Sequence, residues 1–189
     1  MSRWRSLLGA ALLLLPLAGC TVSTSAPGMP SCVPDRDSIT LIAQSVPSAT
    51  KLPCIAELPA GWRFANQEIS SGRTRFWLES DIAGIRAVEA SLERACDVTG
   101  AVPVPSTAAD ELGLNRFDKP EQVRPLRLVR YYRFRGGCIT YRYTFAPGTP
   151  SSLQFQADEA LSFIERGDVV RAVRDFGFEL CGANVPCDG

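Results

Sequence analysis

Residues 126–146 read LRLVRYYRFRGGCITYRYTFA, and this segment predicts a β-hairpin. Apolar and aromatic side chains alternate with arginines on both sides of a Gly136-Gly137 pair, and a period of two is typical of half-buried strands. Two consecutive glycines favour the two-residue turn that joins such strands. A turn at these glycines places Phe134 opposite Ile139 on an apolar face. The segment therefore predicts an antiparallel sheet at the centre of the fold.

The opposite face of this hairpin is rich in arginine. The candidates there for binding an anion or an acidic partner are Arg127, Arg133, Arg135 and Arg142. A guanidinium group binds phosphate or carboxylate through two parallel hydrogen bonds. The plainer interpretation is a solvated sheet face whose charges pair with acidic residues of a neighbouring strand or oppose aggregation. Arg130 is an exception, because the pattern places it on the apolar face, where it stacks on a ring or leaves at the sheet edge.

Residues 62–80 predict a second hairpin, with residues 70–72 as a loop that ends in a left-handed glycine. Phe64 then faces Leu78 on an apolar and aromatic side. The other side is polar and includes Gln67. A shift of one residue would mix the two faces, so the pattern sets the register.

Residues 84–93 fit both a helix and a strand. We favour a third antiparallel strand, because Gly84 costs a helix about 1 kcal/mol relative to alanine. Residues 98–125 are rich in proline, glycine and alanine, and predict a long connection with a short helical turn near residues 107–112.

The two ends of the domain are expected to be helical in part. Residues 152–165 predict a helix, and Asp168 is expected to cap a second one. Residues 35–46 fit a short helix capped by Asp37 or Ser38 that ends at Pro47, or a strand at residues 39–43. Residues 52–62 hold three prolines, which favours an irregular buried segment.

The start of the chain is typical of a bacterial lipoprotein signal peptide. Basic residues precede an apolar run at residues 7–17, and Ala18 and Gly19 then lead to Cys20. The run is shorter than the ~20 residues that a membrane-spanning helix needs. We expect residues 1–19 to be a signal peptide and Cys20 to carry a diacylglycerol with palmitate-type chains. Residues 20–31 form the lipidated and flexible tether, and residues 32–189 form one extracytoplasmic domain.

The number of cysteines agrees with this interpretation. The chain has seven, and assigning Cys20 to the lipid leaves six. Outside the cytoplasm these are expected to form three disulfides. Among the possible connectivities we favour Cys32–Cys54, Cys96–Cys138 and Cys181–Cys187. A zinc site is disfavoured, because the chain has no histidine and no Cys-x-x-Cys spacing.

Composition excludes several function classes. The chain has 20 basic and 20 acidic residues, and without Arg3 and Arg5 the basic count falls to 18, so no basic footprint for nucleic acid is present. The absence of histidine excludes a Ser–His–Asp triad, a Cys–His pair and a histidine metal ligand. Neither a phosphate-binding loop nor a dinucleotide fingerprint is found. Acidic residues such as the Asp158-Glu159 pair offer acid–base chemistry only by proximity in sequence.

Three segments resemble an uncharacterised family of actinobacterial membrane-attached lipoproteins. They are residues 53–62 (PCIAELPAGW), 75–81 (RFWLESD) and 130–141 (RYYRFRGGCITY). The resemblance spans residues 39–180. The family has no known activity, so it implies no catalytic residue. It implies a Gram-positive, high-GC host and a strand at residues 84–93.

We therefore expect an α+β domain with an antiparallel sheet of about five strands, two C-terminal helices on one face and disulfide staples. The expected function is that of a non-enzymatic cell-envelope lipoprotein. Its lipid anchors it to the extracytoplasmic face of the cell membrane, and its domain binds a partner protein or an anionic envelope polymer. The alternative is a module that binds a small ligand or an anionic lipid through a cleft of the sheet and the arginine-rich face. An enzyme is the third class, and no catalytic residue, cofactor or metal is expected.

Overall fold

A computed structural model describes residues 28–34, 38–105, 113–182 and 187. The large sheet is antiparallel, with seven strands in the order β2 (Trp62–Ser70), β3 (Arg73–Ser80), β4 (Gly84–Glu93), β8 (Gly137–Thr144), β7 (Arg127–Phe134), β6 (Asn115–Gln122) and β5 (Val102–Val104). A second sheet pairs β1 (Lys51–Ile55) with β9 (Leu161–Glu165) in antiparallel register. The helices are α1 (Ser38–Ser45), α2 (Ser152–Ala160) and α3 (Arg166–Asp175). The prediction of an α+β fold is confirmed, but the sheet is larger than the expected five strands.

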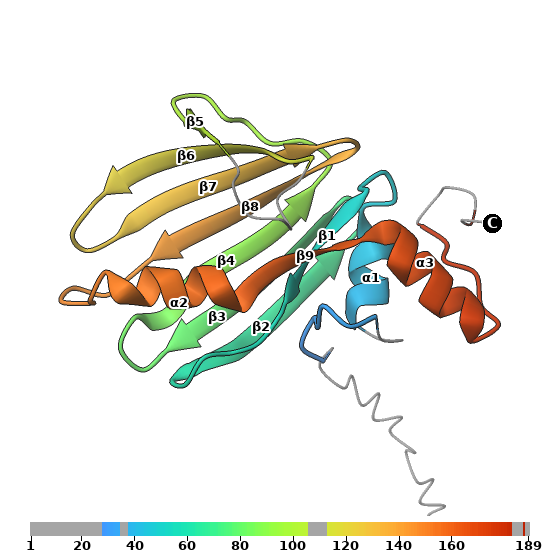
Figure 1. Cartoon of the computed structure of the whole chain (residues 1–189), viewed down its shortest axis with the longest axis horizontal. Coiled ribbons are helices and arrows are strands. Elements are labelled where there is room, and N and C mark those ends of the chain that lie inside the picture. Colours follow the sequence, from blue (N-terminus) through green and yellow to red (C-terminus); the bar gives the residue numbers. More distant parts are fainter. Residues whose placement is uncertain (1–27, 35–37, 106–112, 183–186, 188–189) are drawn as a thin grey trace, which may run out of the picture.

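One face of the large sheet carries the core. Figure 1 shows α2 and the β1–β9 pair crossing this face, with α1 and α3 at one end, while β5 and β6 extend beyond them. The core joins residues of the sheet, the helices and the small sheet, including Phe76, Leu78, Val88, Ile139, Tyr143, Ile42, Leu52, Ala157 and Val169. We call this side the inner face and the opposite side the outer face.

The β7–β8 hairpin forms, with a register two residues away from the predicted one. Tyr132 pairs with Ile139 and Phe134 with Gly137, so the turn consists of Arg135 and Gly136. A shift of two residues leaves every side chain on the face that the alternation predicts. Gly137 is the first residue of β8, and a Cβ at this position would lie 2.9 Å from the Phe134 ring.

The β2–β3 hairpin keeps the predicted pair of Phe64 and Leu78 and then changes register. A β-bulge at Ala65 moves the pairing by one residue, so Gln67 lies opposite Phe76. Gln67 is consequently buried, where the sequence predicted an outward position. Its Oε1 accepts a hydrogen bond of 2.6 Å from Ser38 Oγ.

Residues 84–93 form strand β4, as predicted, and the helical alternative is wrong. The long connection predicted at residues 98–125 is also wrong, because it contains β5 and β6. The helical turn expected near residues 107–112 lies outside the described residues. Pro53 lies within β1, where an irregular segment was expected.

Residues 38–45 form helix α1, so of the two alternatives that the sequence left open there, the strand is wrong. Helix α2 ends at Ala160, and the rest of the predicted helix becomes β9. Helix α3 begins at Arg166 after Glu165, so Asp168 lies in its first turn rather than at its cap.

Three disulfides join the pairs that the sequence favoured, Cys32–Cys54, Cys96–Cys138 and Cys181–Cys187. The first ties the N-terminal segment to β1, and the second ties the segment after β4 to the start of β8. The signal peptide at residues 1–19, Cys20 and most of the tether lie outside the described residues. Among those that are described, no helix has the length and apolar character needed to cross a membrane.

Candidate functional site

Strands β6 and β7 bring charged side chains onto the inner face. Asp118 lies opposite Arg130 and Arg116 opposite Tyr132 in the antiparallel register. Because side chains alternate along a strand, these four share one face. Arg130 is 5% exposed, so its charge is buried in the core rather than carried out at the sheet edge.

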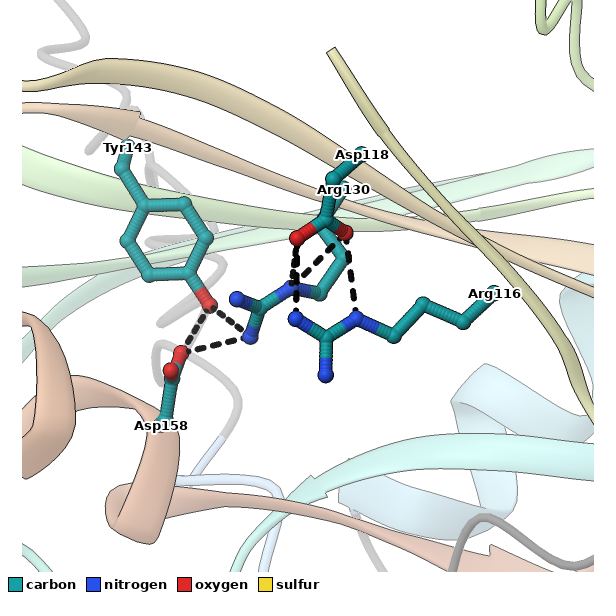
Figure 2. Close-up of polar contacts among 5 residues, drawn as sticks. All are labelled: Arg116, Asp118, Arg130, Tyr143 and Asp158. Carbon is teal, nitrogen blue, oxygen red and sulfur yellow. Dashed lines mark hydrogen bonds and ion pairs between the residues drawn. The ribbon is translucent and has the colours of Figure 1, made fainter. Parts of the chain in front are cut away.

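Arg130 is held by two carboxylates and a phenol (Figure 2). Its Nε donates to Asp118 Oδ1 at 3.1 Å, and its Nη1 donates to Asp158 Oδ1 on α2 at 2.9 Å. Its guanidinium lies 5.5 Å from the centre of the Tyr143 ring. A buried charge is tolerated when paired and hydrogen-bonded in this way.

Asp118 is shared between two arginines. Arg116 Nε donates to Asp118 Oδ1 at 3.1 Å, and Arg116 Nη2 donates to Oδ2 at 2.8 Å, which is a two-pronged contact. Tyr143 completes the network at its other end, where its hydroxyl donates to Asp158 Oδ1 at 2.5 Å. We call Arg116, Asp118, Arg130, Tyr143 and Asp158 the charge network.

The charge network shifts the acidity of its members. Burial opposes the charge of Asp118, but the hydrogen bond from Arg116 and the charge of Arg130 outweigh it, and the pKa of Asp118 is lowered. Burial likewise opposes the charge of Arg130, but Tyr143 and Asp158 prevail and its pKa is raised. Burial, then the charge of Asp158, raises the pKa of Tyr143 well above its usual value, so its hydroxyl remains a neutral donor.

A cavity of about 400 Å³ opens beside the charge network, between β6–β8 and the α2–β9 segment. We call it the inner cavity. It is lined by Ala56, Arg116, Arg130, Tyr132, Tyr141, Phe155, Asp158, Glu159, Leu161, Ser162 and Phe163. It has an aromatic and apolar surface with a few charged groups, which is the usual character of a ligand site.

Three rings pack together at the base of the inner cavity. The ring centroids of Tyr132 and Phe163 are 4.9 Å apart, and those of Tyr132 and Tyr141 are 5.5 Å apart. The Tyr141 hydroxyl also donates to the Ser162 carbonyl at 3.3 Å. Phe155 belongs to the same lining but is 68% exposed, so it lies at the rim. The base is therefore fixed by packing, and the rim is open to solvent.

The four arginines that the sequence singled out lie elsewhere and do not gather into one site. All four are exposed. Arg127 and Arg133 are six residues apart on one strand, which separates them by roughly 20 Å. Arg142 lies 3.8 Å from Glu121, and Arg135 occupies the β7–β8 turn.

Carboxylates balance much of the charge of the outer face. Arg73 pairs with Glu93 at 2.8 Å, and Arg75 with Glu68 at 2.5 Å. A smaller cavity of about 220 Å³ on this face is lined by Arg73 and Arg142 but also by the acidic residues Glu89, Glu93 and Asp97. Acidic residues thus accompany Arg73, Arg75 and Arg142, whereas Arg127 and Arg133 have no ion pair within the described part of the chain.

Sequence reasoning missed Arg116 and Asp118, and it named Asp158 only among scattered acidic residues. The one available signal was Arg130, the charged residue at an otherwise apolar position of β7. A charge there requires a buried partner, and that partner comes from the unpredicted strand β6. Among the described residues, no group of three or more histidine, cysteine or acidic side chains is arranged to hold a metal ion.

A scan against protein-family models finds no match to this chain, and searches among curated proteins and solved structures find none either. The function is therefore argued from the inner cavity and its charge network.

Proposed function

We propose that this protein is a non-enzymatic, lipid-anchored binding protein on the extracytoplasmic face of the cell membrane, and that its ligand occupies the inner cavity. The observation that carries this proposal is a cavity of about 400 Å³ in which aromatic rings surround a fixed set of charged groups. Cavities of this size and lining hold small molecules in many proteins.

The charge network supports a binding role because it holds its groups in place before any ligand arrives. Asp118 fixes Arg116 by two hydrogen bonds, and Arg130 fixes Asp118 and Asp158. A site whose side chains are already ordered loses less conformational entropy on binding. The desolvation cost of burying these charges is offset by hydrogen bonds and ion pairs within the protein, before a ligand binds.

The anchor is supported by the sequence of the leader and by the cysteine pairing. With six cysteines in three disulfides, Cys20 is the one that remains for a lipid. Disulfides of this number are typical of an oxidising compartment. Both features agree with a domain held outside the cytoplasm.

A second candidate function is the binding of a partner protein or an anionic envelope polymer by the outer face. The observation in its favour is that Arg127 and Arg133 are exposed and have no ion pair within the described part of the chain. Such binding would weaken steeply with salt, because exposed charges are screened. Salt-independent binding of a small molecule would favour the inner cavity instead.

Native mass spectrometry of the full-length protein, purified from its host's membranes, tests the inner cavity. Ala56 is exposed and lines the cavity, so Ala56→Trp places a large ring in it. Ala60→Trp is the matched control, an exposed alanine of the same segment outside the lining. We expect a small-molecule adduct on the wild type and on Ala60→Trp that is lost from Ala56→Trp. An adduct retained by Ala56→Trp would refute the cavity as the site.

Intact-mass measurement on the same preparation tests the anchor. We expect a chain that starts at Cys20 with the added mass of a diacylglycerol. Cys20→Ala should remain unprocessed and unlipidated. Equal processing and equal membrane retention of Cys20→Ala would contradict the anchor.

A further inference from the structure

We propose that one end of the large sheet docks on an anionic lipid surface, so that the domain rests in one orientation on the membrane. This inference goes beyond the proposed ligand site, although it uses the proposed lipid anchor to bring the domain to the bilayer. It follows from exposed aliphatic side chains and exposed arginines that gather on the β3–β4 and β6–β7 turns. We call residues 81–86 and 122–127 the docking end.

The strand order brings both parts of the docking end to the same end of the large sheet. Neighbouring strands are antiparallel, so β3, β8 and β6 end where β4 and β7 begin. Figure 1 shows the two turns at the end of the sheet that lies opposite to the β7–β8 turn. Three strand spacings separate them, or about 14 Å. A flat surface can therefore contact both turns at once.

Large aliphatic side chains are exposed on both turns. Ile82, Ile85 and Val123 are between 61% and 84% exposed. The β3–β4 turn that carries the two isoleucines is held in place, because Thr149 Oγ1 donates to the Ile82 carbonyl at 3.2 Å. A single exposed apolar residue needs no explanation, but three on one end of a sheet indicate a surface that meets an apolar partner.

Arginines accompany these aliphatic residues. Three lie in the docking end, and all are exposed: Arg86, Arg124 and Arg127. None of them has an ion pair with another described residue. Arg86 lies 4.7 Å from the centre of the Trp77 ring, a contact that leaves its positive charge in place. Basic residues beside exposed aliphatic ones are typical of surfaces that enter the headgroup layer of an anionic membrane.

The acidic residues at this end do not cancel that charge. Asp81 is the one acidic residue in the sequence of the docking end, and Arg63 pairs with it at 2.6 Å. Glu121, which precedes the second part of the docking end, lies 3.8 Å from Arg142. Both carboxylates thus have cations of their own, and the arginines of the docking end can meet lipid phosphates.

The lipid anchor keeps the docking end within reach of the bilayer. Seven residues separate Cys20 from Gly28, where the described chain begins. A stretch of this length spans at most about 28 Å. Strand β4, with 10 residues, is itself roughly 30 Å long, so the tether is no longer than the sheet. A lipid on Cys20 therefore holds the domain against the membrane, where the high effective concentration makes a weak contact sufficient.

NMR spectroscopy of the ¹⁵N-labelled, lipidated full-length protein in lipid nanodiscs tests this inference. One set of discs holds phosphatidylglycerol in phosphatidylcholine, the other holds phosphatidylcholine alone, and both contain a lipid with a nitroxide headgroup. In the anionic discs we expect paramagnetic broadening of the amides of the docking end to be several-fold stronger than at residues 135–136, in the β7–β8 turn. The difference should shrink in the neutral discs and at about 1 M salt, where the screening length falls to about 3 Å.

Two double variants with equal loss of charge locate the contact. Each arginine near an anionic surface contributes about a fivefold factor to binding, so Arg124→Gln with Arg127→Gln should lower the ratio of docked to undocked protein about 25-fold. Arg133→Gln with Arg135→Gln removes two exposed arginines from the opposite end of the same hairpin and should behave like the wild type. Equal effects of the two double variants would overturn the inference, because a general attraction of positive charge would then explain the binding.

A pair of exposed valines tests the apolar part of the contact. Val123→Asn should weaken docking about fivefold, because the side chain no longer gains from leaving water at the interface. Val102→Asn changes an exposed valine of β5, outside the docking end, and should leave docking unchanged. Docking of Val123→Asn at the wild-type level would contradict the inference.

The outcomes separate this inference from the proposed function. If the protein remains in the anionic discs through its lipid but both ends of the sheet broaden equally, the docking end is wrong and the anchor stands. If the protein does not remain in the discs, both are wrong. The binding of a ligand in the inner cavity depends on neither result.

Discussion

Arg130 carries a positive charge on a face of β7 that is otherwise apolar, and the inner cavity is organised around it. Its side chain is 6% exposed, and it contacts Asp118 on the neighbouring strand and Asp158 on α2. It therefore links the sheet to the helix that covers it. Tyr143 contacts both partners, because its ring lies 5.5 Å from the Arg130 guanidinium and its hydroxyl donates to Asp158.

Arg130→Met should destabilise the protein strongly. The substitution keeps an unbranched apolar stem but removes the guanidinium, so Asp158 loses its cation and Asp118 keeps only Arg116. Loss of such a partly buried ion pair costs about 3 kcal/mol. Urea unfolding followed by tryptophan fluorescence measures this. Arg127→Met, an exposed arginine of the same strand, is the control and should change stability by less than about 0.5 kcal/mol. Equal unfolding midpoints for the two variants would contradict a structural role for the charge network.

Asp118 should make the stability depend on acid pH. In the folded protein the pKa of Asp118 is lowered from its usual value of 3.8. Its contribution to the free energy of unfolding is therefore fully present above about pH 4. That contribution is lost as the pH falls through the lower folded-state pKa, because the folded carboxylate must then take up a proton. Asp118→Asn should be less stable than the wild type at pH 7, and urea unfolding should show the gap narrowing below about pH 4. A gap of constant size would contradict the assignment.

Single residues also show where prediction from the sequence stops. The polar face assigned to the β2–β3 hairpin was right until Ala65, where one inserted residue turned Gln67 inward. Nothing in the alternation marks that bulge, and the hydrogen-bond partner of Gln67, Ser38, lies on α1, outside the hairpin. Arg130 was recognised as an exception, but its partners come from elements far along the chain.

At the level of elements, hairpins with regular alternation were predictable and the elements that build the site were not. Strand β6 lies in a segment whose proline, glycine and alanine content predicts a connection, and it carries Arg116 and Asp118 on its inner face and Pro120 near its end. These residues break the apolar alternation that identifies a strand. The charged residues that make β6 difficult to recognise as a strand are the same residues that belong to the charge network.

Strand β9 was not predicted from the sequence, for a different reason. Leu161 and Ile164 continue the helical spacing of α2, so the sequence reads as one helix. Pairing with β1 overrides that preference, because the backbone of residues 161–165 forms hydrogen bonds with the neighbouring strand β1 instead. Strand β1 was itself not predicted, because it contains Pro53. Tertiary contacts, rather than local sequence preference, thus determine the structure of β6 and β9, which both line the inner cavity.

The β7–β8 turn offers a test at this scale. Gly136 has a φ of +80°, and a Cβ there would lie 1.8 Å from the Ser48 carbonyl oxygen. Gly136→Ala should therefore cost more than Gly148→Ala, a position with a φ of +82° and no atom within 4 Å of the added Cβ. The control should lose roughly 1–2 kcal/mol from backbone strain alone. Urea midpoints in the reverse order would contradict the close approach of this turn to Ser48.

Across the whole molecule, the disulfides should differ in their contribution to stability. Cys96–Cys138 spans 42 residues, whereas Cys181–Cys187 spans 6. If the bridges act by restricting the unfolded chain, removing the first as a double alanine variant costs about 4 kcal/mol and removing the second about 2 kcal/mol. Thermal or urea unfolding of the two double variants checks this order. A larger loss from the C-terminal pair would mean that it does more than close a short loop.

The location of the ligand is the central claim, and NMR spectroscopy tests it most directly. The ¹⁵N-labelled full-length protein in detergent micelles is titrated with the small-molecule fraction extracted from its host's cell envelope. The account predicts amide shifts confined to residues that line the inner cavity, namely Ala56, Phe155, Glu159 and Phe163. Shifts that gather instead on the outer face, around Arg127 and Arg133, would contradict it and assign the binding to the arginine-rich side of the sheet.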